Sequence, residues 1–314
     1  MKLDAIIRDY YFAHFDEMPF DKRFHFVSRL AAWNNDSQAI EKLESYRLKL
    51  APTREAALEQ VFHLYHSPPA MHINSLAARQ PYFDTYPELQ GLDLALFRLR
   101  HLKTIYGIDI VEEFNQVYPV EKLRHIADSL EQDEDALRIL STFAINYIFL
   151  TRYILYPSAS SVDFVKHVHT IASTVTHKTP EQIQLLIYLY THCIICDTNF
   201  YAQPVCFENV DTFMTMLTEL EQIIIDNYSN IHLDNKFEFL VCCRIMDYRP
   251  QAVLTNRIYT EAEQSLSNKG DFLIDRHNSF PQQKKVTFST SEHRNVLFIM
   301  SQSAYPHPLQ YPNT

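Results

Sequence analysis

Glycine is scarce in this chain of 314 residues, which has only three: Gly91, Gly107 and Gly270. At the usual glycine content of about 7%, roughly twenty would be expected. Glycine supplies the positive φ of tight turns and lets the backbone approach a phosphate group closely. The sequence accordingly has no Gly-rich phosphate loop, no dinucleotide-binding fingerprint, no G-x-S-x-G nucleophile elbow and no Asn-Gly hairpin turn. A chain of this length with so few glycines is most simply a pack of helices.

The chain also has fewer positively charged than negatively charged residues. The chain has 28 Lys and Arg residues against 38 Asp and Glu residues, which gives a formal net charge of −10 at pH 7. Duplex DNA and anionic membranes both require a cationic face, so we expect neither nucleic acid nor a membrane as a partner. The densest basic run is RLRHLK at 98–103. It lies in an amphipathic helical pattern, and we interpret it as a solvated helix face.

A membrane-spanning run and a secretory signal are missing too. The most apolar stretch, residues 139–156, is interrupted by Asn146 and Arg152 and is short for a bilayer, so we interpret it as a core helix. The opening residues, MKLDAIIRDYYFAHFDE, are charged throughout and do not resemble a secretory signal. All five cysteines lie between positions 193 and 243. An odd number of cysteines without a signal predicts reduced thiols and a cytoplasmic location.

Helical periodicity dominates what is present. Apolar residues recur every three or four positions in successive segments. We predict an all-α protein of about 12 to 14 antiparallel helices, arranged as an irregular, solenoid-like α/α stack or as an α/α toroid. A single helical domain is expected over residues 1–270. Residues 271–314 are expected to form an irregular C-terminal segment with a short helix near 291–301 and a disordered end.

Capping and turn residues set the expected helix boundaries. Thr179 is a good N-cap, because Pro180 follows at the first helical position and Gln182 lies three residues after the cap. Gly107 is a good helix end. The predicted helices of the domain are 2–16, 20–33, 36–50, 53–66, 88–106, 109–117, 120–130, 134–156, 160–175, 179–200, 209–228, 234–247 and 250–267.

The stretch THCIICDTNF at 191–200 carries the candidate site residues. Within a helix, His192, Cys196 and Asn199 recur at i, i+4 and i+7 and therefore share one face. Thr191 and Thr198 are the neighbouring hydroxyl-bearing candidates. The stretch could be a metal or redox site, a catalytic face or the side of a buried helix.

The cysteines of this stretch have two interpretations. His192 and Cys196 could bind zinc if Cys206 or the Cys242–Cys243 pair completed the site from a neighbouring helix. We favour buried thiols that pack as small apolar side chains, because structural zinc cysteines usually lie in tight knuckles rather than in apolar helices. A redox role is disfavoured because Cys193 and Cys196 lie near a helix C-terminus, where the helix dipole raises a thiol pKa. We therefore expect no cofactor, with zinc as the alternative.

His192 has two interpretations as well. A histidine among apolar neighbours must satisfy both ring nitrogens. We favour a buried polar clamp, in which Thr191, Thr198, Asn199 or a carbonyl of an adjacent helix bonds the ring and fixes how the helices pack. In the alternative, His192 is a general base that faces a cavity, Asn199 orients a substrate, and residues 271–301 close the pocket.

The same stretch resembles a family pattern. Thr191-His192, followed after five residues by Thr198-Asn199-Phe200, is similar to the T-H-x5-T-[DN]-F pattern of an uncharacterised family of helical bacterial proteins. The segment 233–248 is similar in placement to the helix that follows there, so the resemblance covers the C-terminal third. The family usually has glycine after the phenylalanine, whereas this chain has Tyr201, which leaves the end of the helix open. The resemblance implies no function.

Three functions follow from these observations. Because the sequence lacks every glycine-dependent catalytic loop, we predict a non-enzymatic helical scaffold that binds a protein or peptide partner. The first alternative is an enzyme or small-ligand-binding protein with a pocket around His192 and Asn199. The second is a zinc-stabilised helical protein that uses His192, Cys196 and Cys206. The sequence does not indicate which oligomeric state the protein adopts.

Overall fold

The protein is all-α, as predicted. The computed structural model describes residues 2–67, 77–156, 160–174, 179–274 and 287–309. These residues contain no strand, and their only β-type pairing is an isolated bridge between Leu266 and Leu273. The α-helices are α1 (Leu3–Ala13), α2 (Phe20–Asn34), α3 (Ser37–Leu50), α4 (Arg54–His66), α5 (Gln80–Thr85), α6 (Leu89–Tyr106), α7 (Val111–Val117), α8 (Val120–Gln132), α9 (Glu134–Leu140), α10 (Thr142–Leu155), α11 (Val162–Ser173), α12 (Pro180–Asp197), α13 (Val210–Asp226), α14 (Leu233–Ile245), α15 (Ala252–Gln264) and α16 (Glu292–Ser301). Short 3-10 helices are η1 (Phe15–Glu17), η2 (Ala77–Arg79), η3 (Phe207–Asn209) and η4 (Tyr228–Asn230).

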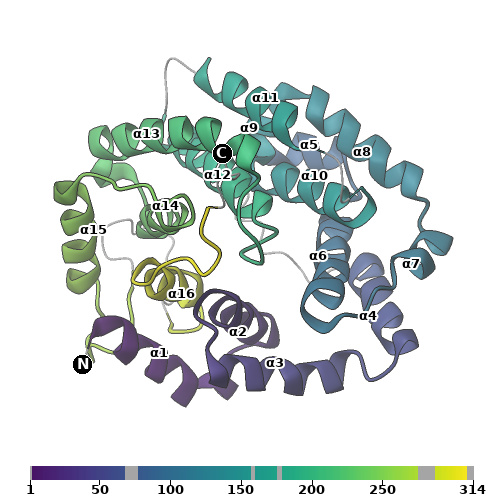
Figure 1. Ribbon diagram of the computed structural model, residues 1–314, viewed down its shortest axis with the longest axis horizontal. Coiled ribbons are helices and arrows are strands. Elements are labelled where there is room, and N and C mark those ends of the chain that lie inside the picture. The colour runs from purple at the N-terminus through teal and green to yellow at the C-terminus, as the bar shows by residue number, and fades with distance from the viewer. Residues whose placement is uncertain (1, 68–76, 157–159, 175–178, 275–286, 310–314) are drawn as a thin grey trace, which may run out of the picture.

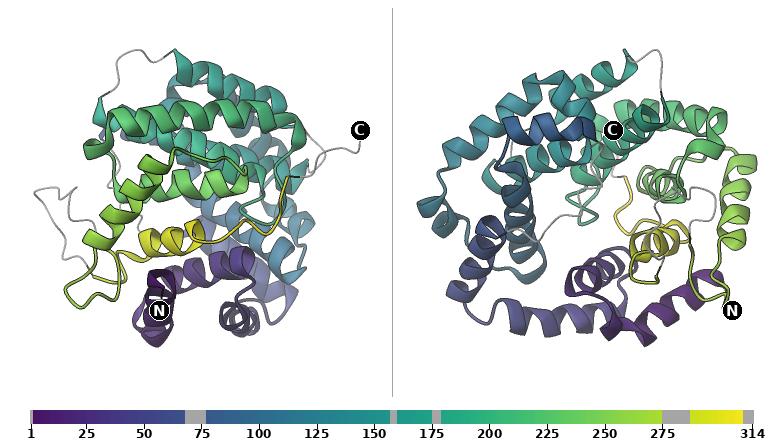
Figure 2. Two further views of the ribbon diagram at one scale, coloured as in Figure 1. Left: turned by 60° about the vertical axis from the view of Figure 1, so that its left-hand side comes forward. Right: turned by 180° about the vertical axis from the view of Figure 1, so that it is seen from behind.

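The helices form an inner group and an outer layer (Figure 1). The inner helices are α2, α6, α10, α12, α14 and α16, and the view from behind shows the same arrangement (Figure 2). Helix α6 packs on α10, α10 on α12, α12 on α14, α14 on α16, and α16 on α2. The remaining pair is α2 and α6. The ring centroid of Phe24 on α2 lies 5.0 Å from that of His101 on α6. The contacts between inner helices therefore close on themselves.

Local sequence signals place several helix ends where we predicted them. The hydroxyl of Thr179 accepts a hydrogen bond from the Gln182 amide, and the Gln182 side chain accepts one from the Thr179 amide, which completes a capping box. Gly107 ends α6 in the left-handed conformation with φ 66°. Asn35 ends α2 in the same way with φ 48°, because asparagine tolerates this region better than most residues.

The apolar stretch 139–156 is a core segment, as predicted, but it is not part of one continuous helix. The predicted helix 134–156 breaks at Ser141, which has φ 50° and separates α9 from α10. The Ser141 hydroxyl donates to the carbonyl of Leu185 on α12 at 2.9 Å, a contact that periodicity alone cannot reveal. This break and the short helix α5 bring the described α-helices to sixteen rather than the predicted 12 to 14. None of the described helices is both long and apolar enough to cross a bilayer.

The basic run at 98–103 is not a solvated face, and this interpretation was wrong. Arg100 and His101 are both 3% exposed. The Arg100 side chain turns into the molecule and donates from Nε to Oδ1 of Asn199 at 2.9 Å. It also donates to the main-chain carbonyls of Asn199 and Phe200. The arginine therefore holds the turn that follows α12.

That turn ends α12 at Asp197, earlier than the predicted residue 200. Three consecutive residues have positive φ: Asn199 at 49°, Phe200 at 52° and Tyr201 at 73°. Phenylalanine and tyrosine adopt this region at a cost in backbone energy. Tyr201 occupies the position where the family pattern has glycine, the residue that adopts a positive φ most easily. Hydrogen bonds from Arg100 and to the Thr198 hydroxyl offset the strain.

The C-terminal segment supplies an inner helix. Helix α16 covers Glu292–Ser301, where the sequence predicts a short helix, and it packs against α14, α2 and α1. Its apolar residues Val296, Leu297 and Met300 are buried. The sequence predicts that the last ten residues, 305–314, are extended or disordered; Tyr305 is instead buried and donates to the Gln203 carbonyl at 2.6 Å, and residues 310–314 lie outside the described residues. The first residue of α16, Glu292, is fully buried as well.

Candidate functional site

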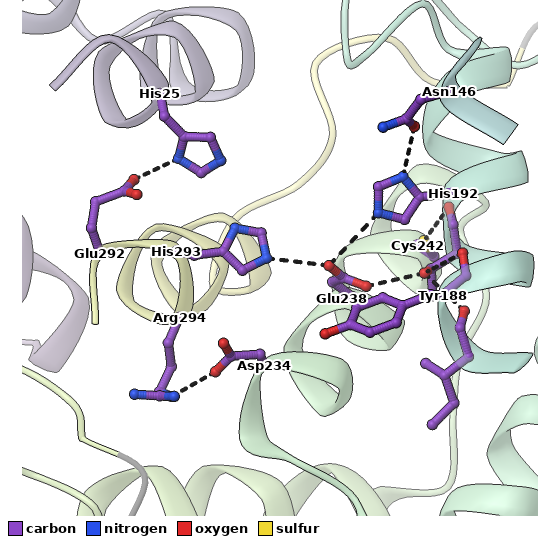
Figure 3. A network of polar contacts seen from close by, with 12 residues as sticks. His25, Asn146, Tyr188, His192, Asp234, Glu238, Cys242, Glu292, His293 and Arg294 are labelled. Atoms are coloured by element: carbon purple, nitrogen blue, oxygen red, sulfur yellow. Dashed lines mark hydrogen bonds and ion pairs between the residues drawn. The ribbon is translucent and has the colours of Figure 1, made fainter. Parts of the chain in front are cut away.

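His192 lies on α12 and points toward α10 (Figure 3). Its Nδ1 lies 2.9 Å from Oδ1 of Asn146, and the thiol of Cys196 donates to the same oxygen at 3.3 Å. The imidazole is 15% exposed. The ring is therefore clamped between helices in part, but its partner is Asn146 rather than any of the groups predicted for it.

A buried carboxylate from α14 is the centre of the site. Glu238 is 2% exposed, and its Oε1 lies 3.2 Å from Nε2 of His293 and 4.0 Å from Nε2 of His192. Its other oxygen accepts a hydrogen bond from Thr191 at 3.1 Å. Figure 3 shows the two imidazoles converging on this carboxylate from α12 and α16. Glu238 therefore links three side chains of two other inner helices.

A second histidine–carboxylate pair lies beside the first. Nδ1 of His25 on α2 lies 2.6 Å from Oε1 of Glu292, which is fully buried. The other Glu292 oxygen lies 3.7 Å from the ammonium group of Lys22. Glu292 begins α16, where the helix dipole favours a negative charge. The ring centroids of His25 and His293 are 5.3 Å apart, so the two pairs face each other.

These contacts assign the tautomers, because an ionised carboxylate only accepts hydrogen bonds. His25 must donate from Nδ1 to Glu292, and His293 must donate from Nε2 to Glu238. Nε2 of His25 and Nδ1 of His293 then remain, and neither has a hydrogen-bond partner among the described residues. The two imidazoles are 24% and 32% exposed, whereas their carboxylates are buried. The arrangement leaves two partly accessible ring nitrogens close together, each oriented by a buried carboxylate.

Burial sets the protonation of this cluster. It lowers the pKa of His192 to about 4, an effect that Glu238 opposes and that His293 and Arg29 increase. Burial and the charge of Arg29 lower the pKa of His25 to about 3, against the influence of Glu292. Burial alone would raise the pKa of Glu238 and Glu292, but their histidine partners lower both. At neutral pH, His25 and His192 are therefore neutral and both carboxylates are ionised.

The cysteines are mainly buried thiols, as we favoured. Cys193, Cys196, Cys242 and Cys243 are buried, and burial raises the pKa of each thiol. Cys206 is partly exposed, and burial together with a hydrogen bond to Glu208 raises its pKa to about 11. All five are therefore protonated thiols at neutral pH, which is the unreactive form.

The structure does not bring together the zinc ligands considered from the sequence. Cys206 lies beyond the turn after α12, and its thiol donates to Glu208 at 2.9 Å. His192 and Cys196 instead share Asn146. Within the described ranges, no group of three or more His, Cys, Asp or Glu side chains is arranged to hold a metal ion.

The remaining candidates have separate roles. Thr191 joins the cluster through Glu238. Asn199 does not share the face of His192, because it lies past the end of the helix and accepts from Arg100. Thr198 is a local capping residue, donating to the Ile195 carbonyl at 2.6 Å and accepting from the Tyr201 amide at 2.9 Å.

Sequence reasoning missed most of the cluster. It did not name His25, Glu238, Glu292 or His293, and it noted Asn146 only as an interruption of an apolar stretch. Their only sequence signal is a polar side chain within an apolar helical pattern, as for Asn146 in the stretch 139–156 and Glu238 within FEFLVCC. Such a signal marks a candidate buried polar group but does not name its partner.

Comparisons with protein-family models, with curated proteins and with solved structures find no match for this chain. The resemblance to the T-H-x5-T-[DN]-F pattern stays a prediction. The function must therefore be argued from the geometry of the cluster.

Proposed function

We propose that the inner helices form an α/α toroid and that the protein is an acid–base enzyme acting on a small polar molecule at the cluster of His25, His192, Glu238, Glu292 and His293. The observation that carries this proposal is the pairing of two buried carboxylates with two facing, partly accessible imidazoles. In each pair, one ring nitrogen donates to the carboxylate, which fixes the tautomer. The other nitrogen of the neutral ring then carries no proton and can accept one.

The energetic cost of the cluster supports a functional role. Moving an ionised carboxylate out of water costs roughly several kcal/mol of solvation free energy, and the contacts of the carboxylate must offset this cost. Glu238 is held by His293 and the Thr191 hydroxyl, with the neutral His192 at 4.0 Å, rather than by an arginine or lysine among the described residues. A purely structural core would be more stable with apolar side chains at these positions, and perturbed ionisable groups of this kind cluster at functional sites.

The chemistry that fits is proton transfer without a covalent intermediate. His25 is neutral at pH 7 and presents Nε2 as a proton acceptor. His293 presents Nδ1 on the other side, at a ring separation of 5.3 Å. The nearby thiol of Cys196 is protonated and therefore a poor nucleophile. Abstraction of a substrate proton, or activation of a water molecule, by one imidazole with the other serving as its acid–base partner matches this set of groups.

Isotope exchange tests the proposal without a known substrate. The purified chain is incubated with a mixture of small metabolites in D2O, and in parallel in H2-18O, and incorporation is followed by mass spectrometry. We expect the wild-type protein to catalyse incorporation of the isotope into one or more compounds. The variants His25→Gln and His293→Gln should reduce that labelling about a hundredfold or more, which is the usual contribution of a general acid or base.

The exposed His125 on α8 provides the matched control. His125→Gln should label like the wild type, and thermal unfolding checks that each variant is folded. The proposal is overturned if the wild type labels nothing, or if both site variants label as fast as His125→Gln.

The scaffold predicted from the sequence stays a prediction, and the described surface gives it no specific support. Its exposed large apolar side chains lie on α3, α7, η3 and α15 rather than on one face: Ile40, Leu48, Val117, Phe207 and Val253. Apolar residues scattered in this way are normal on a protein surface.

A further inference from the structure

A second polar site lies between α2, α6 and the turn that follows α12. It is a cavity of about 150 Å³, and its polar and aromatic lining includes Arg29, Arg100, His101, Thr104, Phe200 and Tyr201. The volume is sufficient for a group of a few heavy atoms. The two arginines make this cavity unlike an ordinary packing defect, which is lined by apolar side chains.

Arg29 is the unusual residue of this cavity. Its Nε atom is buried and has no hydrogen-bond partner among the described residues. In the part of the chain that the structure describes, the guanidinium forms no ion pair, and it lies over the face of Tyr201 at 5.8 Å from the ring centroid. A partly buried guanidinium without an anionic partner is costly, because its five donors and its charge both favour a carboxylate or phosphate.

Arg100 is held rigidly in the same cavity. Its contacts with Asn199 and Phe200 are all to neutral oxygens, so they satisfy its donors without cancelling its charge. The neighbouring His101 is buried, and its Nδ1 lies 3.0 Å from the Phe97 carbonyl. Burial lowers the pKa of His101 well below its usual range, so the imidazole adds no charge. Two cationic groups thus share one small cavity.

None of the described residues that line the cavity carries a carboxylate to balance these charges. The buried carboxylates of the histidine cluster have partners of their own. Glu292 is already paired with His25 and Lys22, and Glu238 with His192 and His293. The cavity is therefore electropositive within a chain whose net charge is −10.

We propose that this cavity binds a small oxyanion, the phosphate or carboxylate group of a ligand, with Arg29 as the charged anchor that pairs with it. Arg100 is the fixed second charge, and Arg29 lies one helical turn from His25 on the same face of α2. The site stands on its own contacts and does not depend on the acid–base chemistry proposed for the histidine cluster.

Calorimetric titration with two simple probes tests this inference. Inorganic phosphate and acetate are titrated separately into the full chain at constant ionic strength and pH 7.5, for the wild type, Arg29→Gln and Arg124→Gln. Arg124 is exposed on α8, where it forms an ion pair with Asp128 and lies over the Tyr156 ring, so its substitution matches the loss of one positive charge elsewhere. We expect at least one probe to bind the wild type and Arg124→Gln equally, and to bind Arg29→Gln about tenfold more weakly or not at all. The probe that binds identifies the class of oxyanion.

Folding is checked separately from binding. Without a bound anion, Arg29→Gln removes an unpaired charge, so its thermal midpoint should equal or exceed that of the wild type. Arg29→Lys keeps the charge but loses the planar fork, and should retain an intermediate affinity. Equal affinity of Arg29→Gln and the wild type, or no binding of either probe to the wild type at about 10 mM, would overturn the proposal.

Discussion

At the scale of single residues, the main finding is that buried carboxylates and imidazoles determine one another's protonation. Glu238 and Glu292 remain ionised because histidines donate to them, and His25 and His192 remain neutral because burial disfavours their charged form. Each group therefore has a protonation state that depends on the fold. This dependence makes stability sensitive to acid.

The pKa of His192 predicts the direction and range of that sensitivity. An unfolded imidazole takes up its proton near pH 6.5, whereas folded His192 does so only at about pH 4. Between these values the unfolded state binds more protons, so the free energy of unfolding decreases as the pH falls. We expect His192 to account for a loss of about 2 kcal/mol at pH 5 relative to pH 7.5, measured by urea denaturation.

Variants separate this contribution from the other ionisable groups. His192→Asn should reduce the loss of stability between pH 7.5 and 5 by about 2 kcal/mol, whatever its effect on stability at pH 7.5, and the remaining dependence belongs to the other groups, such as His25 and His101. His125→Asn, at an exposed site on α8, should keep the wild-type dependence. An unchanged slope in His192→Asn would show that the folded imidazole titrates normally.

At the scale of helices, close packing explains one of the few glycines. Gly91 lies on α6, and a Cβ atom at this position would lie 2.6 Å from the carbonyl oxygen of Tyr65 on α4. Helices α4 and α6 can therefore approach each other only if residue 91 has no side chain. Neither helix can move aside freely, because α6 also packs on α10.

The substitution Gly91→Ala tests this packing through the sign of its effect on the free energy of unfolding. In an isolated helix the change would stabilise by about 1 kcal/mol, because alanine is the better helix former. Here we expect a net destabilisation of about 1 to 3 kcal/mol from overpacking, measured by chemical denaturation. A stabilised variant would mean that α4 and α6 have room between them.

The sequence predicted the helices better than the contacts between them. Capping at Thr179 and the glycine at position 107 are local signals, and both ends lie where predicted. The break at Ser141 depends on a carbonyl of α12, which no local signal describes. The early end of α12 depends on Arg100, about a hundred positions away, and it is the reason Asn199 does not join His192.

At the scale of the whole molecule, the candidate site depends on contacts between inner helices that lie far apart in the sequence. His25 and Glu292 are 267 positions apart, and His293 and Glu238 are 55 apart. Sequence analysis identified His192 and Thr191, which lie near the centre of this arrangement, but it could not supply partners from α2, α14 and α16. The toroid, the cytoplasmic location and the scaffold role stay predictions.

The account rests centrally on two carboxylate-oriented imidazoles facing each other. Long-range 1H–15N correlation spectra of the histidine side chains at pH 7 test it most directly, with assignments from His25→Gln and His293→Gln. We predict a neutral His25 with its proton on Nδ1, and a proton on Nε2 of His293 that is lost to exchange in Glu238→Gln. A doubly protonated His25, or rapid averaging of both tautomers at either residue, would contradict the account.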